Sequence, residues 1–139
     1  MSHFDLLKSC PIFSQLSDSE MILLEKSCEE ILLAKGEDLY KQGDMSKGFC
    51  LIKAGKLSAG DDDGVLNAGD FIGSFSLYKS GLKAKLDVQA IETTALLCLS
   101  QQKFYALGQD NPHIQLKVAY GILNEYVSEL DQVAEILLK

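Results

Sequence analysis

The chain of 139 residues contains no arginine. A guanidinium group is planar, permanently charged and able to bond two phosphate oxygens at once, whereas lysine offers only a mobile point charge. The 13 basic residues are therefore all lysines, and 20 acidic residues bring the net charge to −7. A chain with this balance and no basic stripe binds nucleic acid or anionic lipid poorly. We expect no direct binding to nucleic acid.

Long hydrophobic runs are also missing, because the apolar stretches extend over only a few residues. The first turn carries Asp5 and Lys8, which do not fit a signal peptide. The sequence therefore predicts a cytoplasmic protein without a membrane partner.

Metal-binding patterns are absent as well. Four cysteines are scattered along the chain: Cys10, Cys28, Cys50 and Cys98. None forms the C-x-x-C pair that is typical of zinc and iron-sulfur sites, so we expect reduced, buried or half-buried thiols. The only histidines, His3 and His113, are too few for a metal-dependent β-barrel enzyme. With no nucleophile, base and orienting partner at recognisable spacing, the sequence predicts no catalytic residues, no cofactor and no enzyme.

What is present predicts one domain over residues 1–139, with helices in 1–30, a β-roll in 31–99 and helices in 100–139. Ser17 and Glu20 have capping-box spacing, which predicts a helix from Asp18 to Glu29. Short β-type runs follow at residues 38–40, 48–52, 56–59 and 95–99. The fold class is mainly β with flanking helices (α+β).

Glycines punctuate the β-region where strands should end, because glycine enters positive φ at no steric cost. They occur in Gly36-Glu37, Gly43-Asp44, Gly55, Asp63-Gly64, Gly69-Asp70 and Gly73. The run Asp61-Asp62-Asp63-Gly64 lacks the alternate spacing of a cation loop and predicts a solvated hairpin turn.

This glycine frame, closed by Val88-x-Ala90, resembles the cyclic nucleotide-binding domain of bacterial catabolite activator proteins and of the regulatory subunits of cyclic-AMP-dependent kinase. The resemblance covers residues 6–130 and is closest to the catabolite activator type, because the phosphate cassette aligns with Phe71 to Ala90 without a gap. It implies a double-stranded β-helix, or jelly-roll β-roll, followed by a long C-terminal helix.

Three positions depart from the family pattern that the resemblance implies. Ser74 stands where the family has a glutamate for the ribose hydroxyl. The arginine that clamps the cyclic phosphate falls on Ala84, or on Lys83 if the loop is one residue shorter. Glu129 and Leu130 occupy the positions that contact the purine. Together these departures predict a degenerate cassette that binds cAMP or cGMP with less than normal affinity.

The remaining cassette still predicts a ligand site. A short helical turn after Gly73 should direct N–H groups toward an anion. The predicted binding residues are Gly73, Ser74, Phe75, Ser76, Lys83, Ala84 and Lys85. Three alternatives stay open: a plugged roll, in which Phe75 or Leu86 points inward and no cavity remains; a pocket retuned to a small anionic or apolar effector; and weak binding of cyclic nucleotide.

The C-terminal segment carries a heptad pattern after Asp110, Asn111 and Pro112, which suit a helix start. Its apolar row is Leu116, Ala119, Leu123, Tyr126, Leu130, Val133 and Leu137. A second apolar row, at Ile114, Val118, Ile122 and Ile136, is expected to face the roll. The heptad row then predicts a parallel homodimer, although a helix folded back on its own roll is the simpler alternative. Gly121 is either a weak point or a point of close approach.

Two classes of function follow. The first is a regulatory module that responds to a ligand and signals through the dimer helix or a partner. The second is a structural dimerisation or adaptor module. In catabolite activator proteins a helix-turn-helix follows the long helix, and these 139 residues contain none. We therefore expect any DNA binding to come from a portion outside them or from a partner.

Overall fold

Residues 2–60 and 64–138 are described by a computed structural model, in which the side chains of Val133, Leu137 and Leu138 lie outside the described part. The helical elements are α1 (His3–Ser9), η1 (Pro11–Phe13), α2 (Asp18–Ser27), η2 (Ser74–Leu77), α3 (Gln101–Asp110) and α4 (Pro112–Leu138). The strands are β1 (Glu29–Leu33), β2 (Asp38–Tyr40), β3 (Phe49–Ala54), β4 (Lys56–Ala59), β5 (Val65–Asn67), β6 (Phe71–Ile72), β7 (Val88–Ala90) and β8 (Thr94–Leu99).

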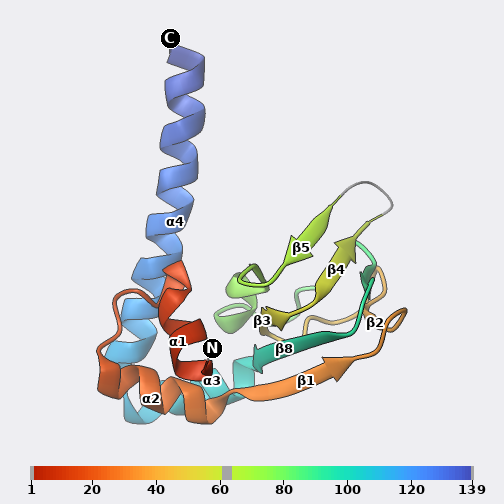
Figure 1. The fold of residues 1–139 in the computed structure, drawn as a ribbon. Helices are drawn as coiled ribbons and strands as arrows, with labels where there is room; N and C mark the ends of the chain where they lie inside the picture. The colour runs from red at the N-terminus through yellow and green to blue at the C-terminus, as the bar shows by residue number, and fades with distance from the viewer. Residues whose placement is uncertain (1, 61–63, 139) are drawn as a thin grey trace.

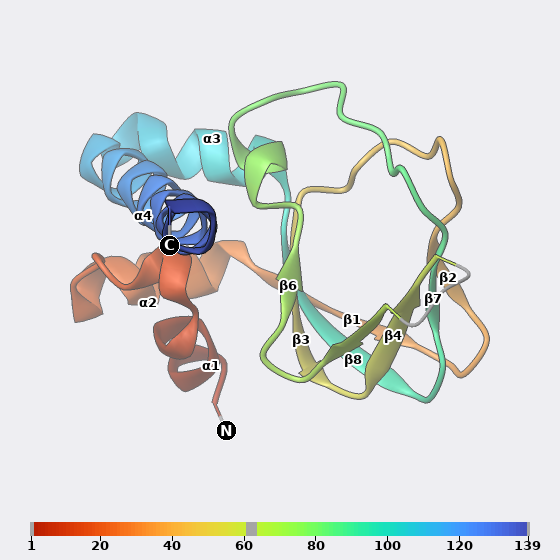
Figure 2. The same ribbon diagram turned by 90° about the horizontal axis from the view of Figure 1, so that it is seen from above.

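The strands form two antiparallel four-stranded sheets, in the orders β1-β8-β3-β6 and β2-β7-β4-β5. Seen from above, the strands and their loops form a ring beside the helices (Figure 2). The predicted jelly-roll β-roll with a long C-terminal helix is confirmed. Strands β4 and β5 pair on either side of Asp61, Asp62 and Asp63, so the predicted turn itself lies outside the described residues.

Strands β3 and β8 are buried on both faces, which explains their nearly continuous apolar sequences. On β3, Phe49 and Leu51 pack against the helices, whereas Cys50 and Ile52 face the interior of the roll. Two hydrophobic cores therefore share one sheet. The helical core contains residues of α1, η1, α2, α3 and the first half of α4, and the second core fills the roll.

Helix α2 begins with the predicted capping box. The Ser17 hydroxyl accepts a hydrogen bond from the Glu20 amide, and the Glu20 carboxylate accepts one from the Ser17 amide. The helix ends at Ser27 instead of the predicted Glu29, because Glu29 already pairs with Cys98 as the first residue of β1. The Glu20 carboxylate also accepts a 2.6 Å hydrogen bond from Lys117 of α4.

Helix α4 packs against the body along its first half and then stands clear of it (Figure 1). Ile114, Val118 and Ile122 are buried in the helical core, as predicted. Ile136 is not part of that face: it is 76% exposed, because the helix has already passed the body. Asp110 does not cap α4, since it is the last residue of α3, and the Asn111 side chain donates to the Leu107 carbonyl.

The predicted heptad row is mostly unpartnered within the chain. Leu116, Leu123, Tyr126 and Leu130 are each at least half exposed, and Ala119 is half-buried. Val133 and Leu137 belong to α4, but their side chains lie outside the described part. Gly121 is a point of close approach: a Cβ there would lie 2.2 Å from the carbonyl oxygen of Ile12 in η1.

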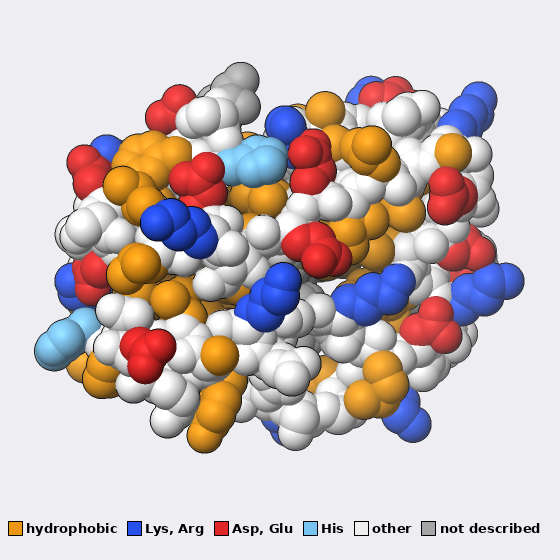
Figure 3. Space-filling model, turned by 90° about the horizontal axis from the view of Figure 1, so that it is seen from below, with side chains coloured by type: hydrophobic (Ala, Val, Ile, Leu, Met, Phe, Trp, Pro, Cys, Tyr) orange, Lys and Arg blue, Asp and Glu red, His pale blue; other side chains and the backbone are white. Residues whose placement is uncertain are grey.

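Charged side chains are mixed on the surface. Seen from below, lysines and acidic side chains are interspersed over the face in Figure 3. Within residues 2–60 and 64–138, no three His, Cys, Asp or Glu side chains come close enough to hold a metal ion. Across the same residues, no helix combines the length and the apolar character that a membrane crossing requires.

Candidate functional site

A cavity of about 470 Å³ opens in the roll beside Gly73. Strands β2, β4, β5, β6 and β7, the turn η2 and the segment 82–86 supply its walls. All seven predicted binding residues line it: Gly73, Ser74, Phe75, Ser76, Lys83, Ala84 and Lys85. The structure thus brings the two halves of the cassette together, and their role in binding stays a prediction.

For the described residues, the hypothesis of a plugged roll is wrong. This hypothesis predicted that Phe75 or Leu86 points into the roll and that no cavity remains. Instead both side chains border the cavity and are more than half exposed, at 56% and 53%. Of the apolar cassette residues, Leu77 and the half-buried Phe71 enter the helical core. The residues that pack in the core of the roll are Ile72, Ala84, Val88 and Ala90.

Gly73 is held in the left-handed conformation that favours glycine, with φ of 83°. A Cβ at this position would also lie 2.1 Å from the carbonyl oxygen of Gly48, so the backbone of the turn sits directly on the start of β3. The predicted helical turn follows as η2, which is anchored by Leu77 in the helical core. The Ser76 side chain is buried and its hydroxyl lies 2.6 Å from that of Ser46. The hydrogen bond with Ser46 thus fixes the Ser76 side chain in the wall of the cavity.

The segment 82–85 runs antiparallel to residues 43–46. Its backbone is fixed by three hydrogen bonds: the Ser46 amide to the Leu82 carbonyl at 2.9 Å, the Ala84 amide to the Asp44 carbonyl at 2.8 Å, and the Gly43 amide to the Ala84 carbonyl at 2.8 Å. Side chains alternate along such a segment. Ala84 therefore packs against the core of the roll, whereas Lys83 and Lys85 are exposed.

The electrostatics of the cavity are simple. Among the described lining residues, Lys83 and Lys85 are the only charged ones. Neither has an ion-pair partner within the described residues. Most of the other lining side chains are apolar: Ala59, Leu66, Ile72, Phe75, Leu82, Ala84, Leu86 and Val88. A chain with a net charge of −7 thus presents two positive charges and an apolar wall to this space.

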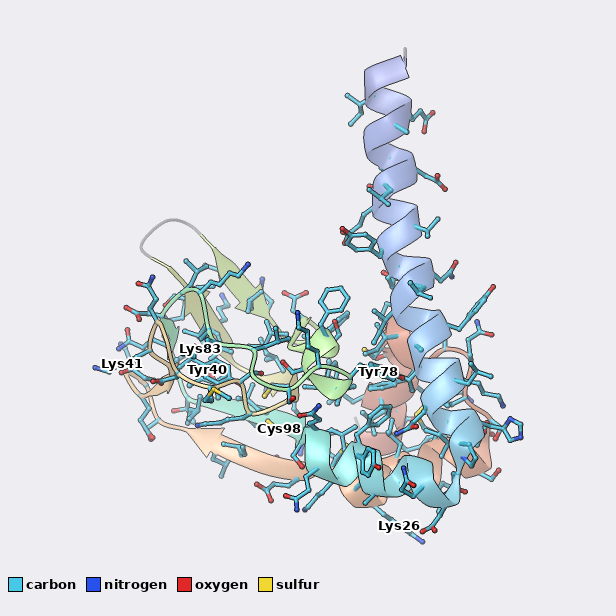
Figure 4. The ribbon with its side chains drawn as sticks, turned by 180° about the vertical axis from the view of Figure 1, so that it is seen from behind. Lys26, Tyr40, Lys41, Tyr78, Lys83 and Cys98 are labelled. Carbon is cyan, nitrogen blue, oxygen red and sulfur yellow. The ribbon has the colours of Figure 1, made fainter. Side chains whose placement is uncertain are left out.

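Tyr40 of β2 closes one side of the cavity. Figure 4 shows it beside Lys83 within the roll. Its ring is buried, and its hydroxyl accepts a 2.7 Å hydrogen bond from the Lys47 amide. Burial raises the pKa of the Tyr40 phenol above its ordinary value, so the group stays neutral at physiological pH. Sequence reasoning missed Tyr40, Ser46 and Leu82 as lining residues, because Tyr40 and Ser46 lie outside the cassette and Leu82 carries no motif.

A second, smaller cavity of about 200 Å³ adjoins the first across Ser74 and Phe75. Its walls include Ile12 and Phe71 from the body and Ile122, Glu125, Tyr126 and Glu129 from α4. Glu129 therefore reaches the neighbourhood of the cassette, as the resemblance implied. Leu130 lines neither of these two described cavities and is 53% exposed, so the second of the two purine positions is not assembled within this chain.

Two aromatic residues connect η2 and its end to the C-terminal helices. The rings of Phe75 and Tyr126 meet edge to face with centroids 6.3 Å apart. Tyr78 packs edge to face on Phe104 of α3 at 5.3 Å, and its hydroxyl donates a hydrogen bond to the Gln115 carbonyl of α4. Figure 4 shows Tyr78 between the roll and α4. The wall of the cavity is thus in direct contact with α3 and α4.

Comparison with known proteins decides the family. The sequence pattern of the cyclic nucleotide-binding domain matches residues 30–111. The chain belongs to the cyclic nucleotide-binding domain family. A cyclic nucleotide-gated channel cone photoreceptor subunit alpha from Gallus gallus is 30% identical over 109 residues, covering 71% of this chain and 15% of that protein. Cyclic nucleotide-gated channel alpha-3 from Homo sapiens is 29% identical over 109 residues, covering 71% of this chain and 16% of that protein.

Solved structures agree on the fold of this cyclic nucleotide-binding domain. The N-terminal domain of a transcriptional regulator from Streptomyces coelicolor superimposes with a TM-score of 0.81 at 23% identity, covering 93% of this chain and 95% of that one. The catabolite activator protein of Thermus thermophilus gives a TM-score of 0.69 at 25% identity, covering 91% of this chain and 62% of that one. The domain spans less than a fifth of the two channel subunits.

Proposed function

We propose that this cyclic nucleotide-binding domain is a non-enzymatic regulatory module that no longer binds cAMP or cGMP with normal affinity. The observation that carries the proposal is the wall of the open cavity. The inward position of the segment 82–85 is Ala84, a methyl group, where the resemblance places the phosphate-clamping arginine. Ser74, also on the wall, replaces the carboxylate expected for the ribose.

The loss of affinity follows from the missing contacts. Hydrogen bonds to charged groups contribute about 1.5 to 3 kcal/mol each, so losing two weakens binding by roughly two to four orders of magnitude. Lys83 and Lys85 supply charge but not the paired, planar geometry of a guanidinium. A domain that would otherwise bind cyclic nucleotide with a Kd of about 1 μM would then have a Kd between about 100 μM and 10 mM.

The cavity itself supports a different small-molecule effector. Its two unpaired lysines favour an anionic group, and its apolar side chains favour an apolar body attached to that group. A small anionic effector of this kind would gain from both features, whereas a polar sugar would gain from neither.

Signalling would pass from η2 to α4. An effector that moves Phe75 changes its contact with Tyr126, and Tyr78 transmits any shift of the turn to Gln115. Ligand binding shifts such an equilibrium only through contacts that differ between two states. The contacts at Phe75, on the cavity wall, and at Tyr78, directly after η2, are the ones that we propose to differ between the two states.

We propose that the output is a homodimer formed through the exposed heptad row of α4, and the net charge of −7 argues against direct contact with nucleic acid or membrane. Apart from the contact of Tyr126 with Phe75, the described side chains of the row are largely exposed apolar groups, with Leu116 at 70% and Leu123 at 61% exposed. A self-complementary helical seam on a two-fold axis would bury it. A cytoplasmic location fits this proposal.

The alternative is a domain that binds cyclic nucleotide normally, which the open cavity and the likeness to cyclic nucleotide-gated channel subunits favour. The double variant Ser74→Glu, Ala84→Arg separates the two functions. It restores both missing groups on one scaffold, so cAMP affinity should rise by two to four orders of magnitude, or about 3 to 6 kcal/mol for two charged contacts.

The matched control is Ser74→Gln with Ala84→Met, which adds similar bulk without charge. The affinities of all three proteins for cAMP and cGMP are measured by thermal shift and calorimetry. A higher affinity in the charged variant, but not in the control, supports the proposal. Equal micromolar affinity in the wild type and the charged variant would show that the cassette was never degenerate.

A further inference from the structure

Two cysteines lie side by side in the core of the roll. Cys50 of β3 and Cys98 of β8 are register partners on neighbouring antiparallel strands, and both side chains face the interior. Their sulfur atoms are 3.1 Å apart. Both residues are almost fully buried, Cys50 at 1% and Cys98 at 8% exposure. Figure 4 marks Cys98 within the lower part of the roll, below Tyr40.

The backbone already meets the requirements of a cross-strand bond. Directly opposed residues of an antiparallel pair have Cα atoms about 4.5 or 5.5 Å apart, depending on their hydrogen bonding. Disulfides need Cα atoms roughly 4.4 to 6.8 Å apart, so either pairing is suitable. Bond formation requires the sulfurs to approach by about 1 Å, from 3.1 Å to roughly 2.05 Å. We expect side-chain rotation to supply this movement, because the strands are already in register.

The two thiols are chemically unequal. The Cys98 thiol donates its hydrogen to the Cys50 sulfur, which lowers the pKa of Cys50 and raises that of Cys98. Lys47 and the Tyr40 hydroxyl add to the stabilisation of the Cys50 thiolate. Burial instead raises the pKa of Cys10 and of Cys28 to about 12. Since the thiolate is the reactive form, Cys50 is the favoured nucleophile of the four.

The pair adjoins residues of the cavity wall. Tyr40 and Ile72 both line that cavity, and Ile72 is the register partner of Cys50 on β6, the strand on the other side of β3 from β8. The cavity is therefore the route by which we expect a molecule as small as hydrogen peroxide to approach the sulfurs.

We propose that Cys50 and Cys98 form a reversible oxidation site that hydrogen peroxide converts into a cross-strand disulfide. The Cys50 thiolate attacks one peroxide oxygen, the O–O bond breaks, and the other oxygen leaves as water after taking up a proton. The Cys98 sulfur then attacks the resulting sulfenic acid and displaces its oxygen as a second water, which carries the Cys98 proton. Two thiols lose two electrons and two protons, and one peroxide becomes two waters.

The proposal does not depend on what occupies the cavity, so it can fail while the proposed function holds. The full chain is treated with hydrogen peroxide under native conditions, quenched with an alkylating reagent, and digested without reductant for mass spectrometry. We expect the loss of two of the four free thiols, a linked peptide pair containing Cys50 and Cys98, and full recovery of the thiols with dithiothreitol. Cys10 and Cys28 should stay in the thiol form and be alkylated when the quenched protein is unfolded.

Matched variants test the pairing. Cys50→Ala and Cys98→Ala should each abolish the linked pair, whereas Cys10→Ala and Cys28→Ala should leave it unchanged. If a variant of a core cysteine fails to fold, the peptide map of the wild-type protein still tests the proposal by itself. A different linkage, an irreversible oxidation of Cys50 without linkage, or a native protein that keeps all four thiols would each overturn the proposal.

Discussion

Gly121→Ala tests how tightly α4 is seated on the body. A Cβ at this position would lie 2.2 Å from the Ile12 carbonyl oxygen, 2.8 Å from its carbonyl carbon and 3.0 Å from its Cα. All three contacts are with backbone, and both sides are fixed by buried side chains, Ile12 at 1% and Ile122 at 7% exposure. Neither chain segment can retreat without opening the helical core.

The sign of the effect follows from two opposing magnitudes. Replacing glycine by alanine inside a helix favours folding by about 1 kcal/mol through helix propensity. Overpacking a closed core costs about 1 to 3 kcal/mol, and more where backbone must move. We expect the steric cost to prevail and the free energy of unfolding to fall by roughly 1 to 2 kcal/mol. Propensity alone would predict stabilisation, so the two effects differ in sign.

Urea unfolding followed by circular dichroism measures this change, with the slope m checked for constancy. Ser128→Ala, at an exposed position on the same helix, is the control and should stabilise slightly through propensity. A Gly121→Ala protein that is as stable as the wild type, or more stable, would refute the close approach of α4 to η1.

Two further predictions concern α4. Glu20→Gln should lower stability at neutral pH by about 1 kcal/mol, because the carboxylate that bonds Lys117 and the Ser17 amide loses its charge. The hydrogen bond from Lys117 lowers the pKa of Glu20 from 4.5 to about 2. The stability that the Glu20 carboxylate contributes is therefore complete above pH 4.5 and is lost as the pH falls toward 2. Stability curves of the wild type and of Glu20→Gln that run parallel across that range would contradict this prediction. Leu123→Asp should convert a dimer into a monomer in sedimentation experiments, whereas the neighbouring exposed change Asn124→Asp should not. An unchanged mass for Leu123→Asp would remove the helix dimer.

The sequence predicted the roll well, because its signals are local. The Ser17–Glu20 capping box and the short β-type runs depend on nearby residues, and both appear in the structure. The glycine frame depends on backbone conformation: its glycines have positive φ as predicted, except Gly64, which does not. Helix α2 ended early for a non-local reason: Glu29 pairs with Cys98, far along the chain. Ile136 was misplaced because helical periodicity says nothing about where the body ends.

In the site too, residues of a local motif could be predicted, whereas contacts between distant segments could not. The cassette residues were found from one continuous motif and they do share a cavity. Whether Phe75 filled that cavity depended on the position of α4, whose Tyr126 holds the ring at the rim. The juxtaposition of Cys50 with Cys98 depended on strand register, which scattered cysteines do not reveal. Contacts across the sheet and between the roll and α4 were thus beyond the reach of spacing arguments.

Calorimetric titration of the wild-type chain with cAMP and with cGMP tests the degenerate cassette most directly. With Ala84 in the clamp position and Ser74 in place of a carboxylate, we predict no binding to either nucleotide at micromolar concentrations. A Kd in the micromolar range for either one would contradict the central claim.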